Sequence, residues 1–586
     1  MKQCAIFLAA IAIFRLATFT VLPTQNLLMQ ESGWDTSHAF TPTTSIDNAI
    51  VRENAHPGTR DWYIPAGKVA TTQIQAYVGA RSVAPGHSLA FYVSTQEAGT
   101  RYAICIYRMG WYHGLGGRLM TTIQALRGQA QGYYNPHTWT LVHCRTCYVN
   151  TQTGLIEARW KRSYALTIPS GWTTGVYLVK FIDAHGFQSY TDFDVLGNNR
   201  AAYAVVTADT TYAAYNNWGG RCLYADNSKP VPASKVSFLR PSTQQNGSDQ
   251  VLIFEADAIH WLERNGYDLS YLSSIDLQTN AAQLLKHKAY ISLGHDEYWS
   301  KEMRDGVESA RDHGVGLAFL EADDAYWQVR FEPSTTGSAN ATMVCYKVST
   351  FNHDLSRDPL YGHDNARVTS QWRDPVVNRP ENALIGIMYS HFTHKQRGFP
   401  WQVNQRATST LLRGTDLVPG QEYDCGVVGY EWDRVFSNGA TPRGLQILAT
   451  SATVSDRGKP DSSNTSVYIA PSGAMVFATG SIYWTAALDT YRYNPDAKCA
   501  GKNIIVGGIQ RFMSNVMAGL VVRHHRSFWK GKPYQPCWPL TEVGRGSLRK
   551  AHTEDICLRE QRCQDRTRRR WRCTHRAYMG SWLYSS

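Results

Sequence analysis

The first part of the chain has short segments in which apolar and polar residues alternate, with turn residues between them. Segments 87–93, 102–107 and 175–181 show this pattern, and the first and third of them follow glycine turns. Many short strands separated by turns are typical of a β-sandwich. The pattern therefore predicts a sandwich of immunoglobulin-like or lectin-like kind over residues 45–197, which ends at the linker Gly197-Asn198-Asn199.

After residue 200 the periodicity changes, and strand-like runs alternate with helix-like runs. The expected strands are 202–207, 267–272, 289–293 and 315–320, and the expected helices are 253–265, 277–287 and 301–313. This alternation predicts a parallel, doubly wound α/β sheet with helices on both faces, over residues 200–526. Runs at 426–430 and 474–479 could complete the sheet, and the polar and aromatic stretch between 335 and 423 predicts an elaborate insertion.

Length and composition fit this picture. A chain of 586 residues, 43% hydrophobic and 18% charged, is globular and long enough for two or three domains. The net charge of +12 lies largely in the last sixty residues, where Arg566 to Arg572 form a basic run. A basic tail without a nucleic-acid motif argues against nucleic-acid binding. We expect no fixed structure for this tail, residues 527–586.

The N-terminal segment 1–23 and the cysteines concern localisation. A short apolar run interrupted by Arg15 resembles a secretory signal, with a membrane anchor as the alternative. We expect a secreted or extracytoplasmic protein that meets a membrane only through such an anchor. Cys144 and Cys147 form the one CxxC motif, which predicts a local disulfide or two free thiols rather than a zinc site, because no second pair completes one.

The candidate chemistry lies where strands of the second half end. Residues 294–299 (Gly-His-Asp-Glu-Tyr-Trp) follow the strand 289–293, and similar polar runs, 209–220 and 321–327, follow two others. In a parallel sheet these ends share one edge, where open α/β folds bind their ligands. Each run alone is also compatible with an ordinary loop closed by a helix cap.

Two kinds of chemistry suit such a cluster. Oxygen donors from Tyr and Glu favour a hard, Lewis-acidic metal, and a trivalent ion would lower the pKa of a phenol enough to bind it. Such an ion polarises a carbonyl and activates water. The metal-free alternative uses His295 as a general base that a nearby carboxylate orients.

Several motifs resemble the large (β) subunit-like family of N,N-dimethylformamidase, over roughly residues 200–490, and a preceding motif resembles the β-domain of relatives. The motifs are Arg108-Met109-Gly110-Trp111-Tyr112, residues 211–216, 294–300, 326–330 and 429–433, and Ser472-Gly473-Ala474. The resemblance implies a glutamine-amidotransferase-like α/β domain and a mononuclear iron, expected to be ferric, bound by two tyrosines and one glutamate. It also implies hydrolysis of the C–N bond of a small amide, with a small partner subunit or a homo-oligomer as the assembly.

The resemblance also assigns residues to roles. Glu297 corresponds to the glutamate ligand, and Tyr215 and Tyr224 are the favoured tyrosine ligands, with Tyr212 in reserve. His295 corresponds to a catalytic or neighbouring histidine.

Glu431 corresponds to an acid/base carboxylate in the family's pattern. Asp323 departs from that pattern, because an Asn is expected in this motif. An acid there replaces a fixed donor by an acceptor or a second charge, which affects how a substrate would be oriented.

Two functions follow from the sequence. The first is an iron-dependent hydrolase of a small or linear amide. The alternative is a secreted, non-catalytic protein that binds a carbohydrate or small molecule with the same fold, and a purely structural hydrogen-bond network is the third hypothesis. Iron content would separate the first from the other two.

Overall fold

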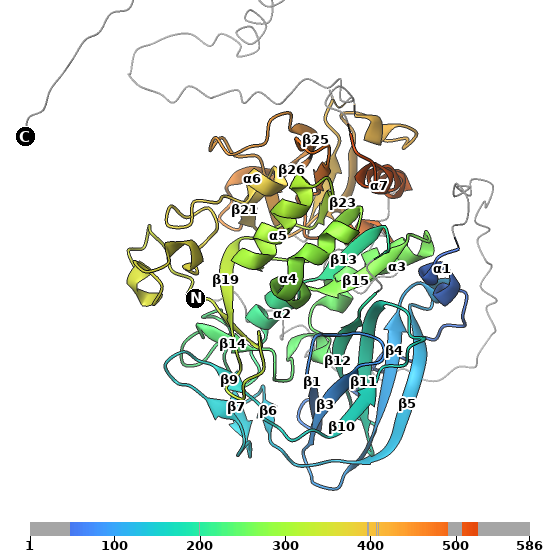
Figure 1. Ribbon diagram of the computed structural model, residues 1–586, viewed down its shortest axis with the longest axis vertical. Helices are drawn as coiled ribbons and strands as arrows, with labels where there is room; N and C mark the ends of the chain where they lie inside the picture. Colours follow the sequence, from blue (N-terminus) through green and yellow to red (C-terminus); the bar gives the residue numbers. More distant parts are fainter. Residues whose placement is uncertain are drawn as a thin grey trace, which may run out of the picture. The chain divides into compact units, whose positions relative to one another are not determined.

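The computed structural model describes residues 47–197, 200–394, 398–405, 407, 409–489 and 507–524, which lie within one compact unit. The expected signal or anchor segment 1–23, part of the linker 197–199 and the tail 527–586 lie outside the described residues. Among the described helices, none is long and apolar enough to cross a membrane. The fold is mixed α/β with several sheets (Figure 1).

The N-terminal region begins with α1 (Ala49–Asn54) and contains two β-sheets that share one apolar core. The first sheet has the order β1-β3-β10 and the second β2-β12-β11-β4-β5. The expected strands at 87–93, 102–107 and 175–181 are confirmed as parts of β3, β4 and β11. The strands are β1 Ile74–Val78, β2 Ser82–Val83, β3 Ser88–Thr95, β4 Arg101–Met109, β5 Gly117–Arg127, β10 Tyr164–Thr167, β11 Gly175–Asp183 and β12 Gln188–Val195.

Two small hairpins extend this β-region between β5 and β10. They pair β6 (Tyr133–Asn135) with β7 (Thr140–Val142), and β8 (Tyr148–Val149) with β9 (Ile156–Glu157). Cys144 and Cys147 form a disulfide in the loop that joins the hairpins. Of the two alternatives for the CxxC motif, the structure therefore shows the local disulfide.

The second half is built on a seven-stranded sheet of order β15-β13-β16-β18-β27-β26-β25. The first five strands are parallel, and β26 is antiparallel to both of its neighbours, β27 and β25. The expected strands before residue 320 and the one at 474–479 are confirmed. The strands are β13 Tyr203–Thr207, β15 Leu269–Ser273, β16 Ala289–Leu293, β18 Gly316–Leu320, β25 Gln446–Val454, β26 Pro460–Ile469 and β27 Met475–Ala478.

The run at 426–430 does not complete this sheet. It falls in β23 (Glu422–Val428), which pairs with β22 (Phe399–Gln402) in a separate two-stranded sheet. A short apolar run has the same pattern in a hairpin and in a central strand, so periodicity could not tell them apart.

Helices cover both faces of the large sheet, as expected. Alternate side chains of β16 point to opposite faces, so that Ile291 packs with the helices α3 and α7, and Tyr290 with α4 and α5. The helices are α2 Asp209–Tyr215, α3 Ala256–Arg264, α4 Ser274–Asn280, α5 Lys301–Asp312, α6 Asn382–Ile385 and α7 Gly507–Leu520. The helix expected at 253–265 is split, because Val251–Glu255 forms a π-helical turn ahead of α3.

Smaller strands surround the edge of the sheet where β16 and β18 end. The last two residues of the six-residue run 294–299, called the hexad below, form β17 (Tyr298–Ser300) together with Ser300. This strand lies at the edge of a four-stranded sheet of order β14-β20-β19-β17. The remaining strands are β14 Lys235–Ser237, β19 Trp327–Glu332, β20 Thr342–Val344, β21 Met388–Phe392 and β24 Glu431–Arg434. Ser300 then caps α5 by accepting a hydrogen bond from the Met303 amide at 3.1 Å.

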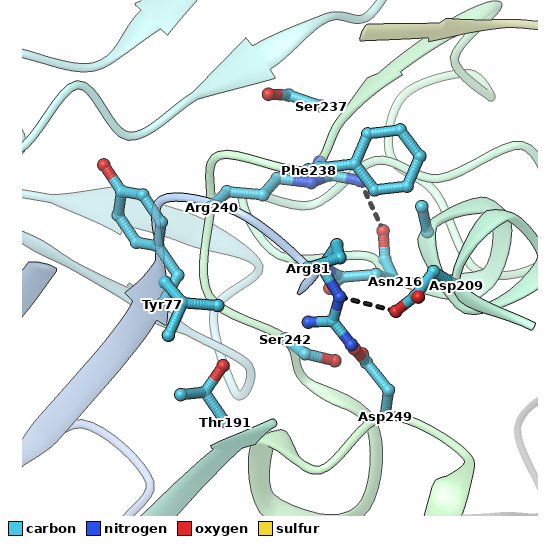
Figure 2. Close-up of a pocket in the computed structure, with 12 residues that line it drawn as sticks. Tyr77, Arg81, Thr191, Asp209, Asn216, Ser237, Phe238, Arg240, Ser242 and Asp249 are labelled. Atoms are coloured by element: carbon cyan, nitrogen blue, oxygen red, sulfur yellow. Dashed lines mark hydrogen bonds and ion pairs between the residues drawn. The ribbon is translucent and has the colours of Figure 1, made fainter. Parts of the chain in front are cut away.

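Charged groups hold the β-region against the α/β half. Arg81 forms ion pairs with Asp209 and Asp249 (Figure 2). Asp192 of β12 is its third partner. Arg108, which has no exposed surface, binds Glu263 of α3 with distances of 2.7 and 2.9 Å. These ion pairs connect residues more than a hundred positions apart, so the position of one half depends on the other.

Candidate metal centre

The hexad is held in place by main-chain contacts on both sides. Gly294 has a φ of +82°, and a Cβ at this position would lie 2.9 Å from Phe254 Cβ, so only glycine fits the turn without strain. The Thr211 hydroxyl on α2 accepts hydrogen bonds from the amides of Glu297 and Tyr298 at 2.9 and 3.3 Å. The Glu297 carbonyl in turn accepts from the amides of residues 326 and 327. Three strand ends therefore meet at one edge.

Tyr215, Tyr224 and Glu297 meet at this edge with their oxygens close together. The Tyr215 hydroxyl donates to Glu297 Oε2 at 2.8 Å, Tyr224 lies 2.9 Å from the same oxygen, and the two hydroxyls are 2.7 Å apart. Metal–oxygen bonds of about 2.0–2.2 Å at right angles separate neighbouring ligand atoms by about 2.8–3.1 Å. The three oxygens thus have nearly the spacing of three ligands on one face of an octahedron.

The protonation of this trio depends on burial. Burial, followed by the charge of Glu297, raises the pKa of both Tyr215 and Tyr224 well above 10, so without a cation they are neutral phenols. Burial alone would raise the pKa of Glu297, but the neighbouring His295 and the charge of Lys347 lower it overall. A metal ion bound here would have to displace the phenolic protons.

His295, Asp323 and Glu431 form a second group beside the trio. One ligand atom from each lies within 4.8 Å of the others, so this group could also hold a metal ion. His295 Nε2 is 3.4 Å from Glu297 Oε2 and 3.6 Å from Glu431 Oε2. His295 Nε2, Asp323 Oδ1 and Glu431 Oε2 are buried without a hydrogen-bond partner in the described structure.

The charges of this second group influence one another. Burial lowers the pKa of His295, but Glu297 and Glu431 outweigh it and raise that pKa above its usual value. Burial raises the pKa of Glu431 to about 7. Burial, and then the charges of Glu297 and Glu431, raises the pKa of Asp323. A carboxyl group with a pKa near 7 can both take up and release a proton near neutral pH.

Asp323 has an unusual backbone conformation. Its φ is +64°, and its amide donates to Asp433 Oδ1 at 2.8 Å. Non-glycine residues with positive φ are uncommon, and strained positions cluster at functional sites. The strand end 321–327 therefore reaches the centre as the sequence predicted, while Tyr212 does not join the trio, because its hydroxyl donates to Glu255 in the core.

Two residues at the centre were not identified from the sequence. Lys347 Nζ lies 3.5 Å from the centre of the Tyr224 ring and 5.1 Å from that of Tyr298, which places a cation over the aromatic rings. The Tyr298 hydroxyl donates to that of Tyr224 at 2.6 Å, so Tyr298 contacts the trio directly. Lys347 follows β20 in the irregular part of the chain, and no motif there marked it.

The sequence of the chain matches that of a known protein family. Residues 103–499 match the family described as N,N-dimethylformamidase beta subunit-like, C-terminal. The chain belongs to this family. The resemblance noted from the sequence motifs is thus confirmed, and the match includes all six residues of the trio and the second group.

Relatives in this N,N-dimethylformamidase-like family are distant. The beta subunits of N,N-dimethylformamidase from Alcaligenes sp. and Paracoccus aminophilus are each 22% identical to the chain, over 466 and 468 residues. Each alignment covers 67% of this chain and 60% of the relative, so the chain matches somewhat over half the length of these proteins. The chain is therefore only distantly related to the beta subunit of this amide hydrolase.

Solved structures resemble the chain only weakly. A superoxide reductase (neelaredoxin) from Ignicoccus hospitalis has a TM-score of 0.12 at 10% identity, covering 21% of this chain and 77% of its own. A cycloisomaltooligosaccharide glucanotransferase from Paenibacillus sp. has a TM-score of 0.16 at 9% identity, covering 45% and 57%. Similarities this low say nothing about the fold or the function.

Proposed function

We propose that this protein hydrolyses the C–N bond of a small amide with a mononuclear iron, held by Tyr215, Tyr224 and Glu297 in a glutamine-amidotransferase-like domain. The observation that carries the proposal is the mutual spacing of three buried oxygens at 2.7–2.9 Å, which suits one hard metal ion. The family relation supplies the reaction class.

The trio is the better iron site of the two groups. Its oxygens already have the separations expected around one ion, and phenolate and carboxylate donors favour a hard ion such as ferric iron. The atoms of His295, Asp323 and Glu431 are spread over distances of up to 4.8 Å.

The bound metal would polarise the amide carbonyl and increase the acidity of water. The protein's own groups then move the protons. Glu431, with a pKa of about 7, accepts a proton as water adds to the carbonyl carbon, and returns it to the nitrogen as the C–N bond breaks. His295 Nε2, which lies 3.6 Å from Glu431 Oε2, exchanges this proton with Glu431 during the transfer.

Asp323 has a substrate-binding role in this proposal. Its Oδ1 is buried without a hydrogen-bond partner in the described structure, and burial with the charges of Glu297 and Glu431 raises its pKa. The carboxyl group can accept a hydrogen bond from an amide N–H, and in its protonated form it can donate one to an amide oxygen. The net reaction consumes one water and yields a carboxylic acid and an amine.

Metal analysis and amide hydrolysis test this function. Wild type should bind about one iron per chain, and Glu297→Ala and Tyr224→Phe should lose iron and activity together. Glu308→Gln on α5, a carboxylate in a partly exposed ion pair with Arg304, serves as the matched control and should change neither. Stoichiometric iron in Glu297→Ala would refute the ligand set, and glycan binding by an iron-free wild type would favour a binding protein.

Localisation and assembly belong to the same proposal. The Cys144–Cys147 disulfide supports export to an oxidising compartment. Assembly with a small subunit or with further copies rests on the family relation alone, and the mass of the purified particle would test it.

A further inference from the structure

Two glutamine side chains connect the catalytic histidine to the backbone of α2. Gln244 Nε2 donates to the Tyr212 carbonyl at 2.6 Å, and Gln250 Nε2 donates to Gln244 Oε1 at 2.8 Å. Gln250 Oε1 then lies 3.2 Å from His295 Nδ1. The three contacts form a continuous chain, which we call the glutamine relay.

The direction of every hydrogen bond in the relay follows from its first member. A main-chain carbonyl can only accept, so Gln244 must present its NH2 group to Tyr212 and its oxygen to Gln250. Gln250 must therefore donate from its own NH2 group to the Gln244 oxygen, which leaves the Gln250 oxygen facing His295. His295 Nδ1 must therefore carry a proton and donate it. The orientations of both glutamine amides therefore follow from the main-chain carbonyl that begins the relay.

The segment that carries both glutamines is itself held in a strained conformation. Gln245, Asn246 and Asp249 have φ values of +43°, +62° and +52°. Positive φ strains residues other than glycine, and strain of this kind persists only where the surrounding structure enforces it. Asp249 accepts from Arg81 of the β-region at 3.1 Å, which ties the segment to the other half of the fold.

A proton on Nδ1 decides what the other ring nitrogen can do. His295 Nε2 is then the atom that faces Glu297 at 3.4 Å and Glu431 at 3.6 Å. The other neutral tautomer carries its proton on Nε2. That proton would occupy the nitrogen that must accept and release a proton in the proposed mechanism. In a serine protease, the wrong tautomer of the catalytic histidine reduces kcat about 10⁴-fold.

We propose that Gln250 is a positioning residue, which Gln244 orients, and that it keeps the proton of His295 on Nδ1 so that Nε2 works in catalysis. The inference rests on the proposed amide hydrolysis for its effect on rate. The tautomer itself does not depend on that function.

Removal of each relay member should reduce kcat in a particular pattern. Gln250→Met keeps the length of the side chain without a hydrogen bond, and should lower kcat about 10- to 100-fold, the usual effect of losing a histidine's supporting partner. KM and iron content should stay as in wild type. Gln244→Met should cause a smaller loss of kcat, because Gln250 remains but its amide group can rotate by half a turn.

The double variant separates the relay from general damage. Because Gln244 acts only through Gln250, Gln244→Met should lower kcat in wild type but have no further effect in Gln250→Met. Gln75→Met in the β-region removes a glutamine that bonds Tyr134 and Trp218, and is the control for lost hydrogen bonds, with kcat unchanged. Additive losses, or an active Gln250→Met, would overturn the proposal.

A second measurement does not require activity. Nitrogen NMR of labelled histidine rings in the metal-free protein is recorded above the raised pKa of His295, where the ring is neutral and carries one proton, and the His295 signals are identified by their absence from His295→Gln. The spectra should show that proton on Nδ1 in wild type and a mixture of Nδ1- and Nε2-protonated rings in Gln250→Met. An unprotonated Nδ1 in wild type would overturn the relay, whatever the enzyme assay shows. An inactive, iron-free wild type with a protonated Nδ1 would instead refute the proposed function and leave the relay standing.

Discussion

Arg108 offers the sharpest test of how the two halves are held together. Its guanidinium has no exposed surface and donates to the Thr174 carbonyl, the Tyr112 hydroxyl and both oxygens of Glu263. Arg108→Met fills much of the same space but removes the charge. Glu263 then keeps only the donors Asn54 and Tyr271 and is left as a buried, uncompensated carboxylate.

The cost of this change can be worked out from the contacts. Removing one partner of a buried ion pair costs about 3–5 kcal/mol, because the other charge stays desolvated. Folded domains are stable by only about 5–15 kcal/mol, so Arg108→Met should lose about a fifth or more of the free energy of unfolding. The double variant Arg108→Met/Glu263→Gln should recover part of this loss, since it also removes the orphaned charge.

Urea unfolding followed by tryptophan fluorescence would measure the change, with eighteen tryptophans as reporters. Arg52→Met is the control, because Arg52 forms an ion pair with Asp47 in which both side chains are exposed, and should cost less than about 1 kcal/mol. A loss below about 1 kcal/mol for Arg108→Met, or a double variant less stable than the single one, would refute the reasoning.

Three further predictions concern other parts of the fold. Gly294→Ala should cost about 1–3 kcal/mol and lower iron content, because the φ of +82° and the contact with Phe254 oppose a Cβ; normal iron binding would contradict this. Cys144→Ser/Cys147→Ser should lower the free energy of unfolding by about 2 kcal/mol, from the entropy of a four-residue loop, and reductant should remove the difference between variant and wild type. Although burial raises the pKa of Asp358, its hydrogen bonds with Arg330 and Thr369 lower it overall, so its stabilisation is present above about pH 4 and lost as the pH falls through the folded pKa. Urea midpoints of wild type and Asp358→Asn should therefore converge between about pH 5 and pH 2, and a constant difference would count against the assignment.

Much of the α/β half could be predicted from the sequence, because local signals agreed with the final packing. The helix α5 has an amphipathic pattern and a Ser300 cap, and both are found in the structure. The strand β23 was wrongly placed in the main sheet, since partner choice depends on residues far along the chain. The immunoglobulin-like or lectin-like and amidotransferase-like assignments, and the domain boundaries, stay predictions.

The residues of the candidate site could likewise be predicted only in part. The motifs contain Tyr215 and Glu297, the family resemblance added Tyr224, and the structure brings the three oxygens together. Lys347 had no such signal, because it reaches Tyr224 only through the pairing of β20 with β19, which no local pattern encodes. Gln250 was missed for a similar reason, since the role of an amide side chain depends on the partners of both its nitrogen and its oxygen.

Thr211 joins two of the proposed ligands in one rigid piece. Its hydroxyl holds the amide of Glu297, and Tyr215 follows four residues later on the same face of α2. The ligand oxygens are thus assembled before any ion arrives, so binding would order few additional side chains and lose little conformational entropy. Ion capture by such a centre would be limited by expulsion of phenolic protons rather than by rearrangement of the chain, and uptake should therefore be faster at higher pH.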